Sequence, residues 1–260
     1  MENQAVLYSV ENEIATITLN RPSSLNSMNE DLVNELASAL QMVEDANSIR
    51  AIVLTGNGRA FCAGGDLAHL ATLKDAMMAK TFIAKVGKLV EKIMSLNKPI
   101  IAMVNGVAAG AGFNLALACD IIYCAKSARF AQSFAKVGLV PDCGGMYLLP
   151  RIVGLHKAKE LMFTADLIDS ATAEKLGLVN KVIEDDSLQR ETYLFAEKLK
   201  NSAPLAIQFI KSTLNSADTL TLQNLLNHEA VVQTLCMQTA DHQEGLNAFK
   251  EKRLPIFTGK

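Results

Sequence analysis

The sequence of 260 residues lacks tryptophan, is only 5% aromatic and contains no run of lysines or arginines. Its 25 basic and 27 acidic side chains give a formal net charge of -2. Nucleic-acid phosphates require concentrated positive charge, so this balance argues against a nucleic-acid partner. Half of the residues are hydrophobic, which excludes a disordered chain and favours a folded domain that binds small molecules.

The sequence also lacks the features of exported and membrane proteins. Its five cysteines are odd in number, scattered and without a CxxC pair, which indicates reduced thiols in a cytosolic protein. The beginning, MENQAVLYSVENE, has acids in place of the basic start and apolar run of a signal peptide. Glycines and asparagines interrupt the most apolar stretch, 99–118. We therefore expect a cytoplasmic protein without membrane contact.

Several catalytic motifs are absent. The histidines are His69, His156, His228 and His242. They show no HExxH spacing, and no GxSxG motif marks a serine nucleophile. The segment from Gly56 to Phe61 begins like a dinucleotide fingerprint, but phenylalanine replaces its third glycine. The sequence predicts neither a metal site nor a nucleotide loop, and each histidine is interpreted as a surface or packing residue.

Strand and helix patterns alternate in the first 125 residues. Apolar strands are predicted at 14–19, 51–55, 100–104 and 121–124, and amphipathic helices are predicted from Asn29 onward and around 86–93. Strands that are apolar on both faces, separated by helices, are typical of an α/β fold with mainly parallel pairing.

The sequence after Gly154 is mostly helical. Helices are predicted at 156–164, 171–176, 187–200, 204–217 and 220–237, with one strand at 178–183. Pro204 suits the first turn of a helix. The apolar stripe through Leu225, Val232 and Leu235 packs either within the chain or partly against another subunit.

Two glycine-rich segments each follow a predicted strand. They are AFCAGGD at 60–66 and NGVAAGAG at 105–112, and both are interpreted as turns that open helices. Backbone N–H groups in such turns can stabilise a developing negative charge, and two converging ones would hold a thioester enolate. Tight packing between helix and strand is the alternative explanation of the glycines.

In order and spacing, five motifs resemble the enoyl-CoA hydratase/isomerase (crotonase) superfamily: AFCAGGDL, NGVAAGAG before LALACDIIY, FAKVGLVPDCGG, LPRIVG and EGLNAFKEKR. The resemblance runs from Asn20 to Arg253. It implies a spiral core of repeated ββα units over 1–195, a helical trimerisation region over 196–260, and a homotrimer or a hexamer of two trimers. It also implies an acyl-CoA substrate, with coenzyme A present only as part of the thioester and no tightly bound cofactor.

The resemblance also implies the site residues. Gly65 and Ala111 match the two backbone donors of the oxyanion hole. The positions expected to contact coenzyme A are Leu25, Ala63, Gly64, Asp66, Leu67, Phe249 and Lys252. In relatives, the last two positions sometimes serve a neighbouring subunit.

Hydratases of this family use two glutamates, at the positions of Asn114 and Phe134 here. An amide and a phenyl ring cannot supply the acid and base that hydration requires. The remaining acid is Asp142, where several isomerase branches carry an acid. One carboxylate suffices to move a double bond, because it can remove a proton from the α carbon and return it to the γ carbon.

We expect the pKa of Asp142 to be raised by burial among Phe134, Val137, Leu139 and Met146. A helix N-cap is its alternative role. Asn114 either orients Asp142 or substrate, or is a satisfied core residue. Asp120 is interpreted as structural.

Three competing functions remain open at this stage: a hydratase that pairs Asp142 with an unusual partner, a dehalogenase-like enzyme with Asp142 as nucleophile, and a catalytically silent CoA-binding subunit. The motifs resemble the phenylacetate-pathway isomerases most closely, which suggests either that reaction or a general enoyl-CoA isomerisation. Residues 68–81 either set acyl-chain length, form a mobile lid or form a plain helix.

Overall fold

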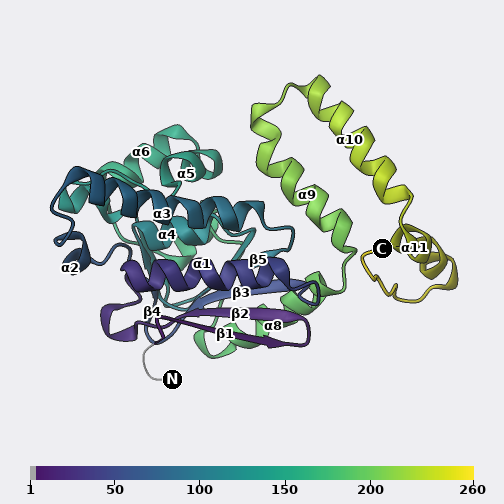
Figure 1. The fold of residues 1–260 in the computed structure, drawn as a ribbon, viewed down its shortest axis with the longest axis horizontal. Coiled ribbons are helices and arrows are strands. Elements are labelled where there is room, and N and C mark those ends of the chain that lie inside the picture. Colours follow the sequence, from purple (N-terminus) through teal and green to yellow (C-terminus); the bar gives the residue numbers. More distant parts are fainter. Residues whose placement is uncertain (1–3) are drawn as a thin grey trace.

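A computed structural model describes residues 4–260 (Figure 1). The strands are β1 Val6–Glu11, β2 Ile14–Leu19, β3 Ala51–Gly56, β4 Ala60–Cys62, β5 Ile100–Val104, β6 Val107–Ala109, β7 Ile121–Ala125, β8 Arg129–Ala131, β9 Ile168–Asp169 and β10 Lys181–Ile183. The helices are α1 Glu30–Asp45, α2 Leu67–Leu70, α3 Ala76–Ser95, α4 Ala111–Leu117, α5 Gly145–Val153, α6 Leu155–Thr164, α7 Ser170–Lys175, α8 Leu188–Lys200, α9 Pro204–Ser216, α10 Leu222–Met237 and α11 Ala240–Glu251.

The strands form two sheets. The larger has the order β1-β2-β3-β5-β7-β10 and is parallel except for the β1–β2 pair, and the smaller has the order β4-β6-β8-β9. Successive strand pairs β3/β4, β5/β6 and β7/β8 each give one strand to each sheet and then lead into a helix. This repetition confirms the predicted α/β fold of ββα units.

Helix α1 shows how the sequence sets local structure. The Asn29 side chain accepts a hydrogen bond from the N–H of Leu32 (3.0 Å), which caps the helix where the sequence predicted its start. Leu32, Leu36 and Leu40 recur at helical spacing and are fully buried. The apolar stripe therefore attaches α1 to the core of the α/β layers.

The short elements are where the sequence prediction was wrong. Segments 60–66 and 105–112 were predicted to be turns, but each contains a three-residue strand, β4 or β6, of the smaller sheet. Strand β10 is shorter than the predicted 178–183. Strand β1 was not predicted, and no bounds were predicted for α5 or α11, although the N-cap role considered for Asp142 and the helical region over 196–260 implied helices there. Three residues are too few to show a period, and glycine and Pro150 hide α5.

Asp120 ties the helical tail to the core. Its Oδ2 accepts hydrogen bonds from the backbone N–H of Ile100 (2.8 Å) and from Nζ of Lys211 on α9 (2.8 Å). Lys211 also donates to the carbonyl oxygen of Ile93 (2.9 Å), and its side chain is buried. These contacts confirm the structural role predicted for Asp120.

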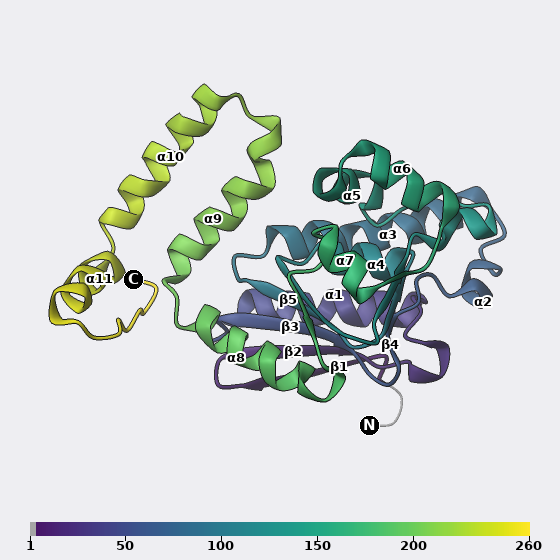
Figure 2. The same cartoon turned by 180° about the vertical axis from the view of Figure 1, so that it is seen from behind.

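Helices α9 to α11 extend away from the α/β layers, as the two opposite views show (Figures 1 and 2). Helix α9 begins at Pro204, as predicted, whereas α10 buries none of its residues. Helix α8 packs on the larger sheet, so the predicted boundary between 195 and 196 falls within a core helix. Within residues 4–260 no helix is long and apolar enough to cross a membrane.

Candidate active site

The two glycine-rich segments converge at one edge of the smaller sheet. Strands β4 and β6 are parallel neighbours, so their carboxyl ends lie side by side. A Cβ atom on Gly112 would lie 2.2 Å from the carbonyl oxygen of Cys62, and one on Gly64 would lie 2.9 Å from that of Ala109. The glycines therefore permit a close approach that a side chain would prevent, which confirms tight packing as one explanation of them.

This approach leaves two backbone donors free. Among residues 4–260, neither the N–H of Gly65 nor that of Ala111 donates a hydrogen bond within the chain. The N–H of Ala111 belongs to the first residue of α4, where the helix itself offers no acceptor. A Cβ atom on Gly64 would lie 3.5 Å from the nitrogen of Ala111, which places the two segments in contact. Such a pair of free donors can stabilise an oxyanion.

The predicted coenzyme A segment gathers beside these donors. The N–H of Ala63 donates to the carbonyl oxygen of Leu25 (3.0 Å), and Met28 forms an isolated parallel bridge with Gly65. Leu67 is well exposed at the start of α2. The structure thus brings together five of the seven predicted contact positions, namely Leu25, Ala63, Gly64, Asp66 and Leu67; their binding of coenzyme A stays a prediction.

Asp66 already has partners within the chain. Its carboxylate accepts from the N–H groups of Ala68 and His69 at the start of α2, and it pairs with Nη1 of Arg21 (2.9 Å). Burial alone would raise the pKa of Asp66, but Arg21 and the two N–H groups lower it below its usual range. Asp66 is therefore a carboxylate at neutral pH that fixes the turn before α2.

Asp142 lies in the loop before α5 and has the most unusual carboxyl group of the site. Its Oδ1 is buried and has no hydrogen-bond partner among residues 4–260. Burial raises its pKa to about 6, and no acidic or basic side chain of the described chain contributes to this shift. The predicted rise is confirmed, and it places the group where a proton acceptor is useful near neutral pH.

Two details of the Asp142 prediction were wrong. The N-cap residue of α5 is Gly144, and no side chain caps that helix. Of the four apolar neighbours expected to enclose the carboxyl, only Phe134 is buried, whereas Val137, Leu139 and Met146 are each about half exposed. Asp142 is therefore free of a capping role, and the single chain encloses it less than the sequence suggested.

Two buried side-chain amides, those of Gln132 and Asn114, form a hydrogen-bonded chain to the Asp142 loop. Nε2 of Gln132 donates to Oδ1 of Asn114 (2.7 Å), and Nδ2 of Asn114 donates to the backbone carbonyl of Asp142 (2.8 Å). A Cβ atom on Gly145 would lie 2.2 Å from Nδ2 of Asn114, so glycine is required there. The sequence had left the role of Asn114 open, and it gave no pattern by which Gln132 could have been found.

Other reactive groups near the site are poor candidates. Burial raises the pKa of Cys62 to about 12 and that of Cys143 well above its usual value, so both thiols stay protonated at neutral pH. His69 packs edge-on against Phe82, with ring centroids 4.6 Å apart. Residues 4–260 contain no group of three or more His, Cys, Asp or Glu side chains that could hold a metal ion.

Phe249 and Lys252 lie elsewhere in the single chain. Phe249 is almost fully exposed on α11, and Lys252 ends that helix in a left-handed conformation. Both views place α11 at the far end of the long axis from α2 (Figures 1 and 2). The structure therefore does not bring these two residues to the loops of the same chain.

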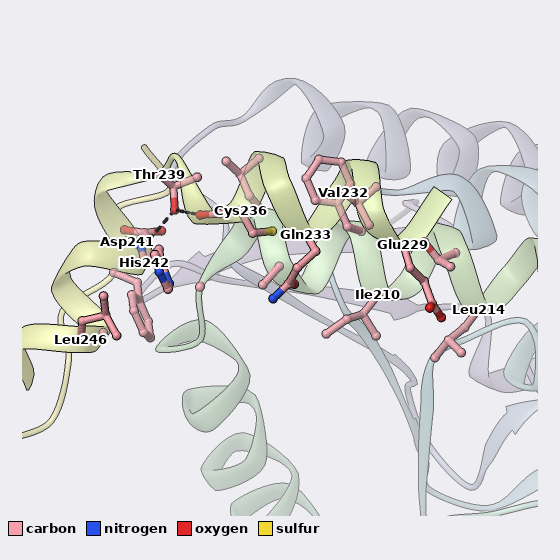
Figure 3. Close-up of a pocket in the computed structure, with 17 residues that line it drawn as sticks. Ile210, Leu214, Glu229, Val232, Gln233, Cys236, Thr239, Asp241, His242 and Leu246 are labelled. Carbon is pink, nitrogen blue, oxygen red and sulfur yellow. Dashed lines mark hydrogen bonds between the residues drawn. The ribbon is translucent and has the colours of Figure 1, made fainter. Parts of the chain in front are cut away.

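An apolar cavity of about 540 Å³ lies between α9, α10 and α11 (Figure 3). Ile210 and Leu214 of α9 and Val232 of α10 contribute to its walls. None of the residues predicted for catalysis lines it, so this cavity is not the candidate active site.

The sequence and the fold both match known proteins. The profile of the enoyl-CoA hydratase/isomerase family matches residues 9–260. The chain belongs to this family. It is 40% identical to 1,2-epoxyphenylacetyl-CoA isomerase of Escherichia coli, with 98% of each chain covered. It is 35% identical to crotonyl-CoA hydratase of Syntrophomonas wolfei over the full length of both chains.

A crystal structure of enoyl-CoA hydratase from Bacillus anthracis superposes with a TM-score of 0.95. It is 32% identical, and the match covers 99% of this chain and all of the other. The family assignment therefore confirms the resemblance seen in the motifs. The relatives include both isomerases and hydratases, so the choice between these reactions depends on the residues of this site.

Proposed function

We propose that this member of the enoyl-CoA hydratase/isomerase family is an isomerase that shifts a double bond in an enoyl-CoA thioester. The observation that carries the proposal is the Asp142 carboxyl, whose Oδ1 is buried without a hydrogen-bond partner among residues 4–260 and whose pKa burial raises to about 6 without a second acid acting on it. A single proton acceptor of this kind is what the isomerisation requires.

In the proposed reaction, the Asp142 carboxylate removes a proton from the carbon next to the thioester carbonyl. The free N–H groups of Gly65 and Ala111 hold the negative charge that develops on the carbonyl oxygen. The protonated Asp142 then returns the proton to the γ carbon, which moves the double bond. The substrate supplies coenzyme A, and no further cofactor enters the proton balance.

The structure gives less support to hydration. Position 114 carries an amide that is fully buried and already bonded to Gln132 and to the Asp142 backbone, and position 134 carries a buried phenyl ring. Neither can activate water. Hydration remains the second candidate because crotonyl-CoA hydratase of Syntrophomonas wolfei is 35% identical over the whole chain.

The deciding experiment offers a 3-enoyl-CoA and a 2-enoyl-CoA in parallel and follows the absorbance of the conjugated thioester. An isomerase raises this absorbance with the first substrate, whereas a hydratase lowers it with the second. We expect Asp142→Asn to abolish isomerisation and to keep CoA binding. The matched control is Asp169→Asn, because Asp169 caps α7 at the surface and asparagine caps equally well.

Three results would contradict the proposal. Turnover that survives in Asp142→Asn would remove Asp142 from the mechanism. Faster hydration than isomerisation by the wild-type protein would favour the hydratase. CoA binding without turnover of either substrate would indicate a silent binding subunit.

The class of acyl group is a finer proposal. The 40% identity to 1,2-epoxyphenylacetyl-CoA isomerase supports a ring-derived CoA ester as the substrate. A general aliphatic 3-enoyl-CoA is the alternative. Comparing the kcat/KM of the two substrate types separates these alternatives. A lower kcat/KM for the ring-derived ester than for the aliphatic 3-enoyl-CoA would favour the aliphatic class.

We also propose that the protein assembles as a trimer or as a hexamer of two trimers. Helix α10 buries no residue within the chain, although Leu222, Val231 and Leu235 are large apolar side chains. Exposed apolar surface of this extent favours contact with other subunits. In such an assembly, Phe249 and Lys252 of one chain would be able to approach the coenzyme A site of another.

A further inference from the structure

We infer that Gln132 and Asn114 form a hydrogen-bond relay that positions Asp142 for proton transfer. This inference rests on the proposed function, because it assigns Asp142 the role of proton acceptor. Gln132 is the new residue in it, and neither its type nor its place in the sequence pointed to the site. Both amides are positioning residues, since they reach the reacting carboxyl only through the backbone of Asp142.

The loop that carries Asp142 needs such support. Cys143 and Gly144, which follow Asp142, both have positive φ angles (51° and 73°), and the first of these is a non-glycine residue in the left-handed region. The carbonyl oxygen of Asp142 accepts two hydrogen bonds, from Nδ2 of Asn114 (2.8 Å) and from the N–H of Gly145 (2.9 Å). These two bonds hold the unfavourable turn in place.

The directions of the hydrogen bonds fix the whole relay. The carbonyl of Asp142 can only accept, so Asn114 must turn its NH₂ group towards it and its oxygen towards Gln132. Gln132 must therefore present its NH₂ group to Asn114. The Oε1 of Gln132 is buried and has no partner among residues 4–260. The only hydrogen bond of the Gln132 side chain in the described chain thus goes to the relay.

The same short segment also supports the oxyanion donor of Ala111. Ala131 ends β8, and its carbonyl oxygen accepts from the N–H of Gly110 (2.9 Å), the residue before Ala111. Ala131 thereby supports one side of the site through Gly110, and Gln132 supports the other side through Asn114. The end of β8 consequently sets the position of the proton acceptor relative to the N–H of Ala111.

The central test is Gln132→Met, which keeps the side-chain volume and removes the hydrogen-bond donor. We expect kcat for 3-enoyl-CoA isomerisation to fall about 10- to 100-fold, because small errors in the position of a reacting group have effects of this size. We expect KM to change by less than about twofold, because the relay leaves the coenzyme A segment untouched. Thr55→Val is the matched control: it removes one buried hydrogen bond, to the carbonyl oxygen of Met103 (2.8 Å), within the larger sheet.

A double-mutant cycle with Asn114→Leu tests whether the two amides act as one unit. We expect the Gln132→Met/Asn114→Leu protein to be as slow as Asn114→Leu alone. A kcat for Gln132→Met equal to that of Thr55→Val, or additive effects in the cycle, would overturn the relay. Gln132→Leu is a second variant that also removes the donor. If neither Gln132→Met nor Gln132→Leu folds, the hydrogen bond between Gln132 and Asn114 is purely structural and the relay is overturned.

A second measurement separates this inference from the proposed function. Infrared titration of the carboxyl band, with Asp142→Asn as reference, reports the protonation of Asp142 without any turnover. We expect the Asp142 pKa to decrease in Gln132→Met, because a loosened loop admits water to the carboxyl. This decrease in a protein that does not isomerise would support the relay and refute the isomerase. An unchanged pKa together with an unchanged kcat would refute the relay alone.

Discussion

At the scale of single residues, the chemistry of the site depends on the contrast between two aspartates. Asp66 is held as a carboxylate by Arg21 and by two backbone N–H groups. Oδ1 of Asp142 has no hydrogen-bond partner among residues 4–260, no basic side chain acts on this carboxyl, and burial raises its pKa to about 6. Two identical side chains in one site therefore differ in their affinity for a proton because their surroundings differ. Only the second can both accept and return a proton near neutral pH.

The raised pKa of Asp142 predicts the pH dependence of isomerisation. The reaction begins with the deprotonated carboxylate, so kcat/KM should fall about tenfold per pH unit below the pKa of that group. We expect this decline to begin near pH 6, where an ordinary aspartate would still be fully active. Initial rates with a 3-enoyl-CoA between pH 4.5 and 8 measure it. A rate that stays constant down to pH 4.5 would show that another group accepts the proton.

The same pKa predicts an effect on stability. The folded protein binds the Asp142 proton more tightly than the unfolded chain does. This carboxyl therefore leaves the unfolding free energy unchanged below about pH 4 and lowers it progressively between about pH 4 and about pH 6. A pKa raised from 3.8 to about 6 corresponds to ~3 kcal/mol at most, and partial solvent contact reduces this to about 1–2 kcal/mol. Asp142→Asn should raise the unfolding free energy by that amount at pH 7.5.

Denaturant unfolding at pH 7.5 and at pH 4, at one protein concentration, measures this difference. The gain should be lost at pH 4, where Asp142 is protonated in the folded protein. Asp169→Asn provides the comparison, because Asp169 lies at the surface and the capping contacts of its carboxylate lower its pKa. An equal gain at both pH values would mean that the charge of Asp142 is not the cause.

At the scale of elements, the oxyanion hole depends on how closely α4 approaches β4. Gly112 in the first turn of α4 leaves no room for a Cβ atom against the carbonyl oxygen of Cys62. Gly112→Ala should push α4 away from β4, separate the N–H groups of Gly65 and Ala111, and lower kcat by about 100-fold or more, as the loss of an oxyanion donor does. We also expect it to destabilise the fold by about 1–3 kcal/mol through overpacking.

Gly87→Ala is the matched control for this prediction. Gly87 lies within α3, and a Cβ atom there would meet nothing within 4 Å. Alanine at an open helical position should stabilise the protein by about 0.5–1 kcal/mol and leave the rate unchanged. Measurements of kcat and of thermal unfolding for the two variants test this prediction. A Gly112→Ala protein as active as Gly87→Ala would show that the oxyanion hole does not need the close approach of α4 to β4.

The elements also show what the sequence could predict and why. Helix α1 was predictable because it is long enough to show its period of buried side chains, and strands β3 and β5 because each is a continuous apolar run of five or six residues. Strands β4 and β6 were not, since their three residues are recognisable only through pairing with each other. The relay from Gln132 to Asp142 joins three separate segments of the chain, and no local sequence pattern records such a contact. The role implied for Phe249 stays a prediction, because in the single chain this residue lies far from the loops of the site.

At the scale of the whole molecule, the chain consists of a compact α/β part and an extended helical tail. The α/β part holds the free N–H groups and Asp142, whereas the tail leaves an apolar cavity of about 540 Å³ and an unburied helix α10 (Figure 3). Both features favour the proposed assembly, because exposed apolar side chains gain free energy when a partner covers them. The tail is therefore the part where assembly should determine activity.

The last prediction tests this dependence with Leu235→Glu on α10. Leu235 is about half exposed in the single chain, and burying a leucine side chain in an interface contributes about 1.5–3 kcal/mol. A charge at this position in every subunit should dissociate the proposed trimer or hexamer, which sedimentation velocity detects as a loss of mass.

Asn227→Glu is the control, because it adds the same charge to the same helix at an exposed polar position. If Phe249 and Lys252 serve a neighbouring subunit, dissociation should also raise KM for the CoA thioester. A wild-type protein that sediments as a monomer, or a Leu235→Glu protein of unchanged mass and KM, would show that α10 does not hold the assembly together.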